Sequence, residues 1–268
     1  MEEYLKRKDL SSNMNTEPKI VRLTQENISQ YPPTCFLNPK NEGYQIKLKW
    51  TKKRFSEGLK INQLYSEKEG KCIGFIEYIP GEYAWRAVNA EGYMFIHCLW
   101  ISPNKYKRQG YGSLLVEECI KDAKREGKYG VAVVTSEGPF MAGKNLFLKN
   151  KFTSVAHADP SFELMVNLVK KGPLPEFRDW EKQLSTYEEL NIIYSNQCPW
   201  VARSIKELSE VAKEQGLEIN VTELKDAEQA QNAPSIYATF NLVYNGRLLV
   251  DHYISRKRFL NIVNKEIK

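Results

Sequence analysis

The chain has 268 residues, of which 42% are hydrophobic and 27% are charged. Domains usually contain about 100–200 residues, so two domains are expected rather than one. No segment approaches the run of about 20 apolar residues that a membrane helix needs, and no apolar run follows the charged N-terminus. We therefore expect a cytoplasmic protein without a membrane partner. The net charge of +6 is spread over interspersed lysines and glutamates, which does not point to nucleic acid but is compatible with a small polyanionic ligand.

The cysteines are odd in number and widely scattered. Their spacing fits neither a disulfide framework nor a metal site, so no metal is expected. Most are expected to be buried, reduced thiols that behave as small hydrophobic residues, with Cys198 as the exception discussed below. The five are Cys35, Cys72, Cys98, Cys119 and Cys198.

The first part of the chain alternates strand and helix patterns. A run of nine mostly apolar residues at 93–101 predicts a strand buried on both faces, and apolar residues at helical spacing over 112–123 predict an amphipathic helix that ends before Gly127. In chain order we predict a polar tail at 1–18, a strand at 19–23, a helix at 42–59, a hairpin of strands 61–66 and 72–79, the strand at 93–101, the helix at 112–123, a strand at 130–135, a short helix at 143–149 and a strand at 161–169.

A change of composition divides the chain. Residues 171–189 contain two prolines, many charges and few aliphatic residues, which is typical of a linker between a first domain at 19–170 and a second at 190–268. In the second domain, Asn245-Gly246 between two apolar runs indicates a hairpin. Its predicted elements are a strand at 190–195, a helix at 199–216, a strand at 218–224, a short helix at 226–231, strands at 236–244 and 247–253, and a helix at 256–267.

The segment Lys107-Arg-Gln-Gly-Tyr-Gly112 lies between a predicted strand and a predicted helix. Unpaired N–H groups at a helix N-terminus carry partial positive charge, and glycines let that backbone approach an anion closely. Together with Lys105, Lys107 and Arg108, the loop is suited to a pyrophosphate. The alternative is a tight turn with solvated lysines.

This stretch resembles motif A of the GNAT acetyltransferase superfamily, Gln/Arg-x-x-Gly-x-Gly/Ala, with Lys107 at the first position. The resemblance covers about residues 19–170 and implies an α/β fold with a mixed, splayed sheet flanked by helices. It also implies that acetyl-CoA is the cofactor, with its pantetheine arm beside residues 99–101 and its pyrophosphate on the backbone amides of 108–113. The implied cofactor-binding residues are Leu99, Trp100, Ile101, Lys107, Arg108, Gln109, Gly110, Tyr111, Gly112, Ser113 and Asn145.

One departure from the family concerns the general acid. Many members carry a tyrosine on the last helix that protonates the coenzyme A thiolate, and that place falls on Phe147, which has no proton to donate. Tyr111, Tyr93 or a water would have to serve instead, unless the thiolate leaves without an acid.

Transfer to an amine also needs a base, for which the candidates are Glu77, Glu82 and His97. His97 has a suitable pKa but is also compatible with a satisfied core histidine. Glu77 lies on an apolar strand face, where an unpaired carboxylate would be costly. Glu82 belongs to Pro80-Gly-Glu-Tyr-Ala-Trp-Arg86, which is either a ligand-recognition segment or an exposed loop with one aromatic anchor.

In the second domain, Cys198-Pro199 follows a buried strand and precedes a helix expected to start at Pro199. A helix N-terminus would lower the pKa of the Cys198 thiol. The element order and Tyr194-Ser-Asn-Gln-Cys-Pro-Trp200 resemble the glutaredoxin branch of the thioredoxin superfamily, with Val201 at the second cysteine. That resemblance places a cis proline at Pro234 beside the thiol. The alternative is a scaffold in which Cys198 only caps a helix.

The combination of both domains resembles the bacterial YoaP-like family, with matches at Gly92-Tyr-Met-Phe-Ile, Glu82-Tyr-Ala-Trp and Asn232-Ala-Pro-Ser. We predict an acetyl-CoA-dependent N-acetyltransferase for a small amine, with a smaller, single-cysteine thioredoxin-like domain that binds or senses a thiol partner. Two alternatives stay open: a thiol-redox or thiol-adduct protein using Cys198, and a non-catalytic acyl-CoA sensor.

Overall fold

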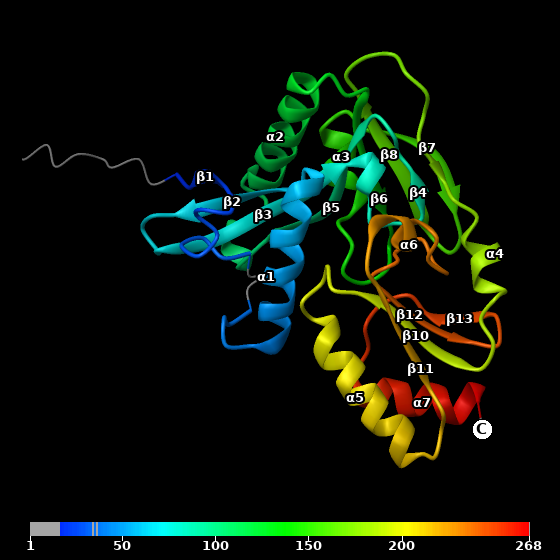
Figure 1. Cartoon of the computed structure of the whole chain (residues 1–268). Coiled ribbons are helices and arrows are strands. Elements are labelled where there is room, and N and C mark those ends of the chain that lie inside the picture. The colour runs from blue at the N-terminus through cyan, green and yellow to red at the C-terminus, as the bar shows by residue number, and fades with distance from the viewer. Residues whose placement is uncertain (1–16, 34, 36, 268) are drawn as a thin grey trace, which may run out of the picture.

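The computed structural model describes residues 17–33, 35 and 37–267, so nearly all of the predicted tail at 1–18 lies outside the described residues. Two sheets organise the chain (Figure 1). The larger has seven strands in the spatial order β1 (Lys19–Arg22), β2 (Lys60–Ser66), β3 (Lys71–Pro80), β5 (Tyr93–Ile101), β6 (Gly130–Thr135), β8 (Phe162–Leu168) and β7 (Thr153–Ala158). Its helices are α1 (Glu42–Arg54), α2 (Tyr111–Arg125) and α3 (Lys144–Lys149).

The seven-stranded sheet opens between β5 and β6. These strands pair in parallel from Tyr93 opposite Gly130 to Ile96 opposite Val133. Their pairing then stops, although β5 continues to Ile101 and β6 to Thr135. The two strands therefore separate at their carboxyl ends, the same end at which the loop 102–110 leads into α2.

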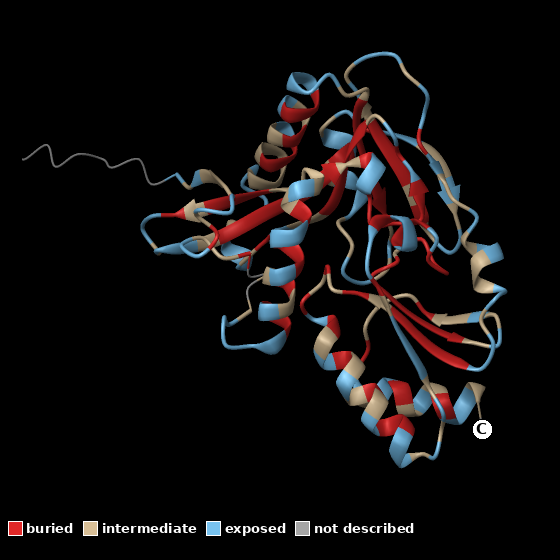
Figure 2. Cartoon of the chain, in the orientation of Figure 1, coloured by how far each residue is buried: buried red, intermediate tan, exposed pale blue. Residues whose placement is uncertain are grey.

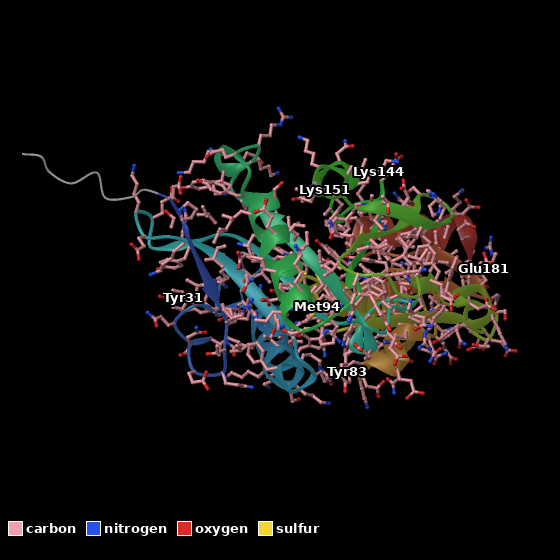
Figure 3. The ribbon with its side chains drawn as sticks, turned by 90° about the horizontal axis from the view of Figure 1, so that it is seen from above. Tyr31, Tyr83, Met94, Lys144, Lys151 and Glu181 are labelled. Atoms are coloured by element: carbon pink, nitrogen blue, oxygen red, sulfur yellow. The ribbon has the colours of Figure 1, made fainter. Side chains whose placement is uncertain are left out.

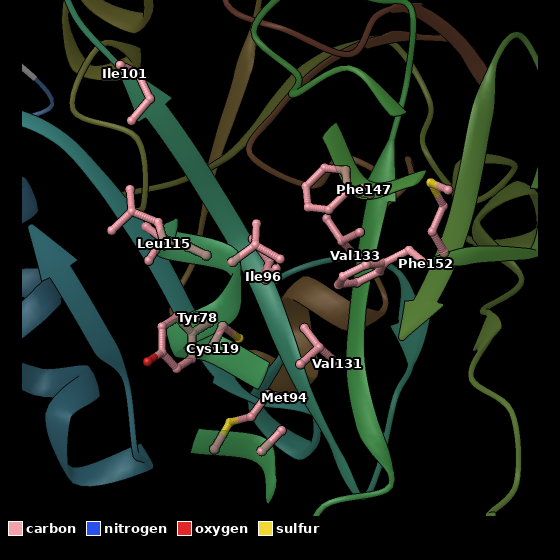
Figure 4. Packing of buried hydrophobic residues seen from close by; sticks show 14 of the residues in the cluster. Tyr78, Met94, Ile96, Ile101, Leu115, Cys119, Val131, Val133, Phe147 and Phe152 are labelled. Carbon is pink, nitrogen blue, oxygen red and sulfur yellow. The ribbon is translucent and has the colours of Figure 1, made fainter. Parts of the chain in front are cut away.

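One face of this sheet is packed against α2 and α3 (Figure 4). The apolar spacing that predicted α2 is the face that it buries, with Leu115 and Cys119 against Ile96. Phe147 of α3 packs on Phe152 with ring centroids 5.3 Å apart. Figure 3 shows Met94 inside the molecule, whereas charged side chains such as Lys144, Lys151 and Glu181 lie at its periphery.

The smaller sheet has the spatial order β11 (Asn220–Leu224), β10 (Leu190–Ser195), β12 (Phe240–Tyr244) and β13 (Arg247–Val250). β10 is parallel to β11 and antiparallel to β12, which pairs antiparallel with β13. The helices of this part are α5 (Val201–Glu214), α6 (Ala227–Gln231) and α7 (Arg256–Glu266). The fold is thus mixed α/β, with a large sheet followed by a small mixed sheet.

The two sheets share a buried core. Trp50 and Trp85 from the first part pack with Ile193, Ala230 and other apolar residues of the second. α1 runs beside α5 (Figure 1), and buried residues continue through both sheets (Figure 2). Burial of this apolar surface makes the second part an integral wall of the first rather than a loosely tethered module.

The segment 171–189 is more structured than its composition predicted. It contains β9 (Glu176–Phe177), which pairs with β4 (Val88–Asn89), and α4 (Trp180–Leu184). The Tyr93 hydroxyl donates to the Pro173 carbonyl at 2.8 Å. Its prolines and charges therefore lie on a segment held by backbone and side-chain hydrogen bonds.

Several element predictions need correction. The helix predicted at 42–59 ends at Arg54, and the strand predicted at 218–224 begins at Asn220. β7 was missed because none of its six residues is buried and the exposed ones do not alternate regularly. The strand predicted at 236–244 begins only at Phe240, and that predicted at 247–253 ends at Val250. The helix predicted from Pro199 begins at Val201, because residues 196–200 form turns first.

Candidate active site

The site lies where β5 and β6 separate, and loop residues 197–200 and 237–239 of the second part line the gap. A cavity of about 60 Å³, the inner cavity, lies there and shares part of its wall with a second cavity of about 570 Å³, the outer cavity. Strand β5, the segment 140–142 and the second part of the chain all contribute to both walls. The shared wall residues are Cys35, Cys98, Leu99, Phe140, Met141, Ala142, Cys198 and Tyr237.

Glu77 on β3 lies in the inner cavity and is 1% exposed. Lys47 of α1 forms a buried ion pair with it, and Gln197 Nε2 donates to Glu77 Oε1 at 3.1 Å. Burial alone would raise the pKa of Glu77, but the Lys47 ammonium and His97 hold that pKa at about 2. The expectation that a carboxylate at this position must be paired is confirmed, and the carboxylate stays ionised.

His97 lies at an irregularity in the β3–β5 register: Glu77 faces Cys98 and Tyr78 faces Ile96, so His97 has no partner opposite. Such bulges redirect a side chain. Its Nε2 accepts the Trp85 backbone N–H at 2.9 Å, and its Nδ1 lies 3.5 Å from Glu77 Oε1. Burial lowers the pKa of His97 to about 4, so the ring is neutral, and the nitrogen that would accept a proton is already occupied. This arrangement favours a positioning histidine over a base.

Glu82 is placed apart from this site. It lies in the 3-10 helix Gly81–Tyr83, and its carboxylate accepts from Gly92 N and Lys128 Nζ, each at 3.2 Å. Of the three candidate bases, the fold brings together only Glu77 and His97 at the cavity. Tyr83 is exposed like Glu82, but residues 84–86 are not an exposed loop, because Trp85 is 1% and Arg86 3% exposed.

Arg86 and Gln197 form a second polar group at the cavity that sequence reasoning missed. Arg86 Nη1 donates to Gln197 Oε1 and to the Trp85 carbonyl, both at 2.6 Å, and Nη2 donates to the His97 carbonyl at 3.0 Å. The guanidinium also lies 4.7 Å from the ring centroid of Tyr237. Gln197 thereby bridges Arg86 and Glu77. The only sequence signal for the burial of Arg86 is that its neighbours in the chain, Trp85 and Ala87, are apolar.

The glycine loop has the geometry of an anion site. Gly110, the residue before α2, has φ +84°, and Arg108 has φ 64°. No side chain caps this end of α2, so its first N–H groups remain directed outward. Lys107 lines the outer cavity, whereas Lys105 is paired with Glu69 and is not available to a ligand.

The other predicted cofactor residues divide into several groups. Leu99 and Trp100 line the outer cavity, while Ile101 is buried in the core. Gln109 donates to the Lys105 carbonyl at 2.6 Å, and Ser113 Oγ accepts from Asn150 at 3.0 Å. Of the predicted cofactor residues, only Leu99, Trp100 and Lys107 line the cavities; Asn145 is exposed on α3.

Three thiols reach the cavities from separate segments: Cys35, Cys98 and Cys198. Burial raises the pKa of all three, that of Cys98 to about 12. The prediction of a lowered pKa for Cys198 is therefore wrong, because burial outweighs a helix start that lies three residues further on. Among the described residues no group of three or more cysteine, histidine or acidic side chains is arranged to hold a metal ion.

The predicted cis proline is also wrong, since the described cis bonds precede Pro103 and Pro160 and not Pro234. Phe147 lines the inner cavity, as its match to the family position implied. The hydroxyl of Tyr93 is committed to Pro173 elsewhere. Two phenols of the second part, those of Tyr237 and Tyr253, lie on the cavity walls instead.

A separated strand pair, an uncapped helix start and a polar cavity lie together at this end of the large sheet. The acetyltransferase (GNAT) family model matches residues 23–149, and the YoaP-like family model matches residues 218–261. A Bacillus subtilis (strain 168) protein described as an uncharacterized N-acetyltransferase, YoaP, is 32% identical over 251 residues, covering 91% of this chain and 98% of that protein. The chain belongs to the GNAT family of N-acetyltransferases and carries a C-terminal YoaP-like region.

Solved structures of acetyltransferases are similar to more than half of the chain. The PaiA N-acetyltransferase from Thermoplasma acidophilum, in complex with coenzyme A, is 18% identical with a TM-score of 0.41, covering 57% of this chain and 99% of that one. Aminoglycoside 6'-acetyltransferase type Ii is 14% identical with a TM-score of 0.44, covering 58% and 99%. In the described part of this chain, no helix is long and apolar enough to cross a membrane.

Proposed function

We propose that the protein transfers the acetyl group of acetyl-CoA to a small amine in a cavity completed by the second part of the chain. The observation that carries this proposal is the end of β5–β6 pairing at Ile96 and Val133, beside the uncapped start of α2. Backbone groups of β5 beyond Ile96 have no strand partner on the β6 side and suit the pantetheine arm. The amides of residues 108–113 suit the pyrophosphate, with Lys107 and Arg108 adding positive charge.

Bound acetyl-CoA supplies the activated acetyl group, which the amine nitrogen accepts as the thiol leaves and one proton is lost. The ionised Glu77 carboxylate attracts and orients the acceptor ammonium and takes up its proton, directly or through water. With a pKa of about 2, Glu77 holds that proton only briefly before it passes to solvent. His97 is a positioning residue: its Nε2 accepts the Trp85 N–H, and its Nδ1 lies 3.5 Å from Glu77 Oε1.

Tyr237 is the phenol best placed to protonate the leaving thiolate, since it lines both cavities whereas Tyr253 lines only the outer one. Burial raises the pKa of Tyr237, which keeps its proton in place at neutral pH. Tyr237 would thus act as the general acid, a role that Phe147 cannot fill because its side chain has no proton to donate.

The second part of the chain is, in this proposal, a thioredoxin-like unit from 190 onward whose main role is to complete the cavity. The order β10-α5-β11-α6-β12-β13-α7 supports the resemblance, whereas the bond before Pro234 and the raised pKa of Cys198 depart from a redox-active version. A thiol-bearing partner at Cys198 stays a second candidate, supported by the shared wall of Cys98 and Cys198.

Release of free coenzyme A across a panel of amines, with calorimetric titration of acetyl-CoA, tests the proposal. We expect saturable binding, weakened by Arg108→Glu but not by the matched control Lys151→Glu on the exposed surface beyond α3. Absence of acetyl-CoA binding would rule out the proposed function. Binding without coenzyme A release for any amine would favour the acyl-CoA sensor.

A further inference from the structure

Arg86 is a buried cation without an acidic partner. It is 3% exposed and lines the inner cavity. Its hydrogen bonds go to two backbone carbonyls and to the side-chain oxygen of Gln197, all of them neutral. Among the described residues no carboxylate forms an ion pair with it.

Other buried charges in the described part of the chain come paired. Lys47 is paired with Glu77, Arg54 with Glu57, and Asp122 with Arg22. An uncompensated buried charge is strongly unfavourable, because the charge has lost its hydration and gains no opposite charge in return. The charged residues that line the inner cavity are Lys47, Glu77 and Arg86, so one positive charge there is unmatched.

The free donors of Arg86 lie on one edge of the guanidinium. A guanidinium has five N–H groups, and three of those on Arg86 are used, two on Nη1 and one on Nη2. The remaining two, on Nε and Nη2, meet no acceptor among the described residues. Two parallel donors on one edge match the two oxygens of a carboxylate.

We propose that Arg86 anchors a carboxylate of the acceptor, so that the acceptor is a small amine that also carries a carboxylate, of the amino-acid type. This inference rests on the proposed acetyl transfer. The spacing of the two binding groups supports it: a single amide, that of Gln197, spans from Arg86 at 2.6 Å to Glu77 at 3.1 Å. A carboxylate on Arg86 and an ammonium near Glu77 are therefore close neighbours, as they are in an amino acid.

The dimensions of the two cavities also favour an acceptor of the amino-acid type. The inner cavity of about 60 Å³ has room for about four water-sized groups, enough for the polar end of an amino acid and not for a bulky acceptor. The outer cavity of about 570 Å³ is available to the side chain and to the cofactor arm. Gln197 holds Arg86 in place, so the second part of the chain determines which acceptor binds.

Matched pairs of acceptors test the inference: standard L-amino acids against their amides, compared by kcat/KM for coenzyme A release. We expect the wild type to prefer acids over amides by about 100-fold, the size of a charge-assisted pair. Arg86→Gln should reduce this preference to about 3-fold or less, and Arg86→Lys should retain part of it. Arg54→Gln is the matched control, since Arg54 is also buried and contacts the Trp85 ring but does not line the cavity.

A merely structural role for Arg86 would lower the rates for acids and amides alike and leave their ratio unchanged, which overturns the inference. Efficient acetylation of simple amines by the wild type, without preference for a carboxylate, overturns it while the proposed acetyl transfer stands. Calorimetric binding of N-acetyl-L-amino acids provides a readout independent of turnover. Binding that Arg86→Gln abolishes supports the inference, and absence of any carboxylate-dependent binding or turnover overturns it.

Discussion

Gly43 marks the contact on which the shared cavity depends. It lies in the first turn of α1, and a Cβ added there would be 2.0 Å from the carbonyl oxygen of Pro199, although real Cβ atoms essentially never come within 3.0 Å of such an atom. The added Cβ and the Pro199 carbonyl are both fixed to the main chain, so neither can move aside by a side-chain rotation. Gly43→Ala must therefore push the 196–200 turn away by about 1 Å. Overpacking of this kind typically costs about 1–3 kcal/mol.

The displacement has a defined consequence for the site. The Gln197 bonds of 2.6 Å to Arg86 and 3.1 Å to Glu77 would each lengthen by about 1 Å, beyond hydrogen-bond range. A misplacement of about 1 Å in a catalytic site lowers activity by up to about 100-fold. We therefore expect Gly43→Ala to lose about 10- to 100-fold in kcat/KM with little change in acetyl-CoA affinity, because the cofactor loop is not touched.

Urea unfolding, initial rates and acetyl-CoA titration measure the three effects. Gly143→Ala is the control, because a Cβ at Gly143 would meet nothing within 4 Å. Alanine normally stabilises a helix by about 1 kcal/mol relative to glycine, so destabilisation by Gly43→Ala reports the clash itself. A Gly43→Ala variant as stable and as active as the wild type would refute the shared cavity.

Four further predictions follow from the site. Glu77→Gln should lower kcat/KM by about 10²- to 10⁴-fold while calorimetry shows unchanged acetyl-CoA affinity; unaltered rates would contradict its role. Tyr237→Phe should lower kcat by about 100-fold, and Tyr253→Phe much less, so equal effects would argue against Tyr237 as the acid. Burial lowers the pKa of His97 from 6.5 in the unfolded chain to about 4 in the folded protein. Below about pH 6.5 the unfolded chain therefore binds a proton that the folded protein does not, and the free energy of unfolding should fall by about 3 kcal/mol as the pH approaches 4. Urea unfolding at pH 7 and pH 4.5 should show this loss, and His97→Gln should reduce it. Cys198 should react slowly with iodoacetamide at neutral pH because burial raises its pKa, and Cys198→Ser should retain coenzyme A release; rapid alkylation would favour the thiol-adduct alternative.

Local sequence patterns were sufficient to predict the elements proposed to bind the cofactor, β5, α2 and the loop between them. The apolar run at 93–101 and the helical spacing after Gly112 predicted β5 and α2 closely, because each element buries the residues that form its pattern. The loop between them was found because its glycines and cations follow one another in sequence. β7 was missed because none of its residues is buried, so the strand leaves no periodic signal.

The acceptor side depends on contacts that no local pattern records. Glu77 was identified because a carboxylate in an apolar strand requires a partner, but that partner, Lys47, lies on a helix 30 residues earlier. Arg86 and Gln197 are separated by 111 residues and meet only because the two sheets share a core. The pKa of Cys198 was misjudged for the same reason: a helix start is visible in sequence, whereas burial by another part of the chain is not.

A crystal structure with acetyl-CoA bound would show directly whether the cofactor lies between the two separated strands. We expect the pyrophosphate on the backbone amides of residues 108–113, the pantetheine arm between the separated ends of β5 and β6, and the thioester in the cavity near Glu77, Cys198 and Tyr237. A cofactor bound elsewhere, or a thioester directed away from the second part of the chain, would contradict this expectation.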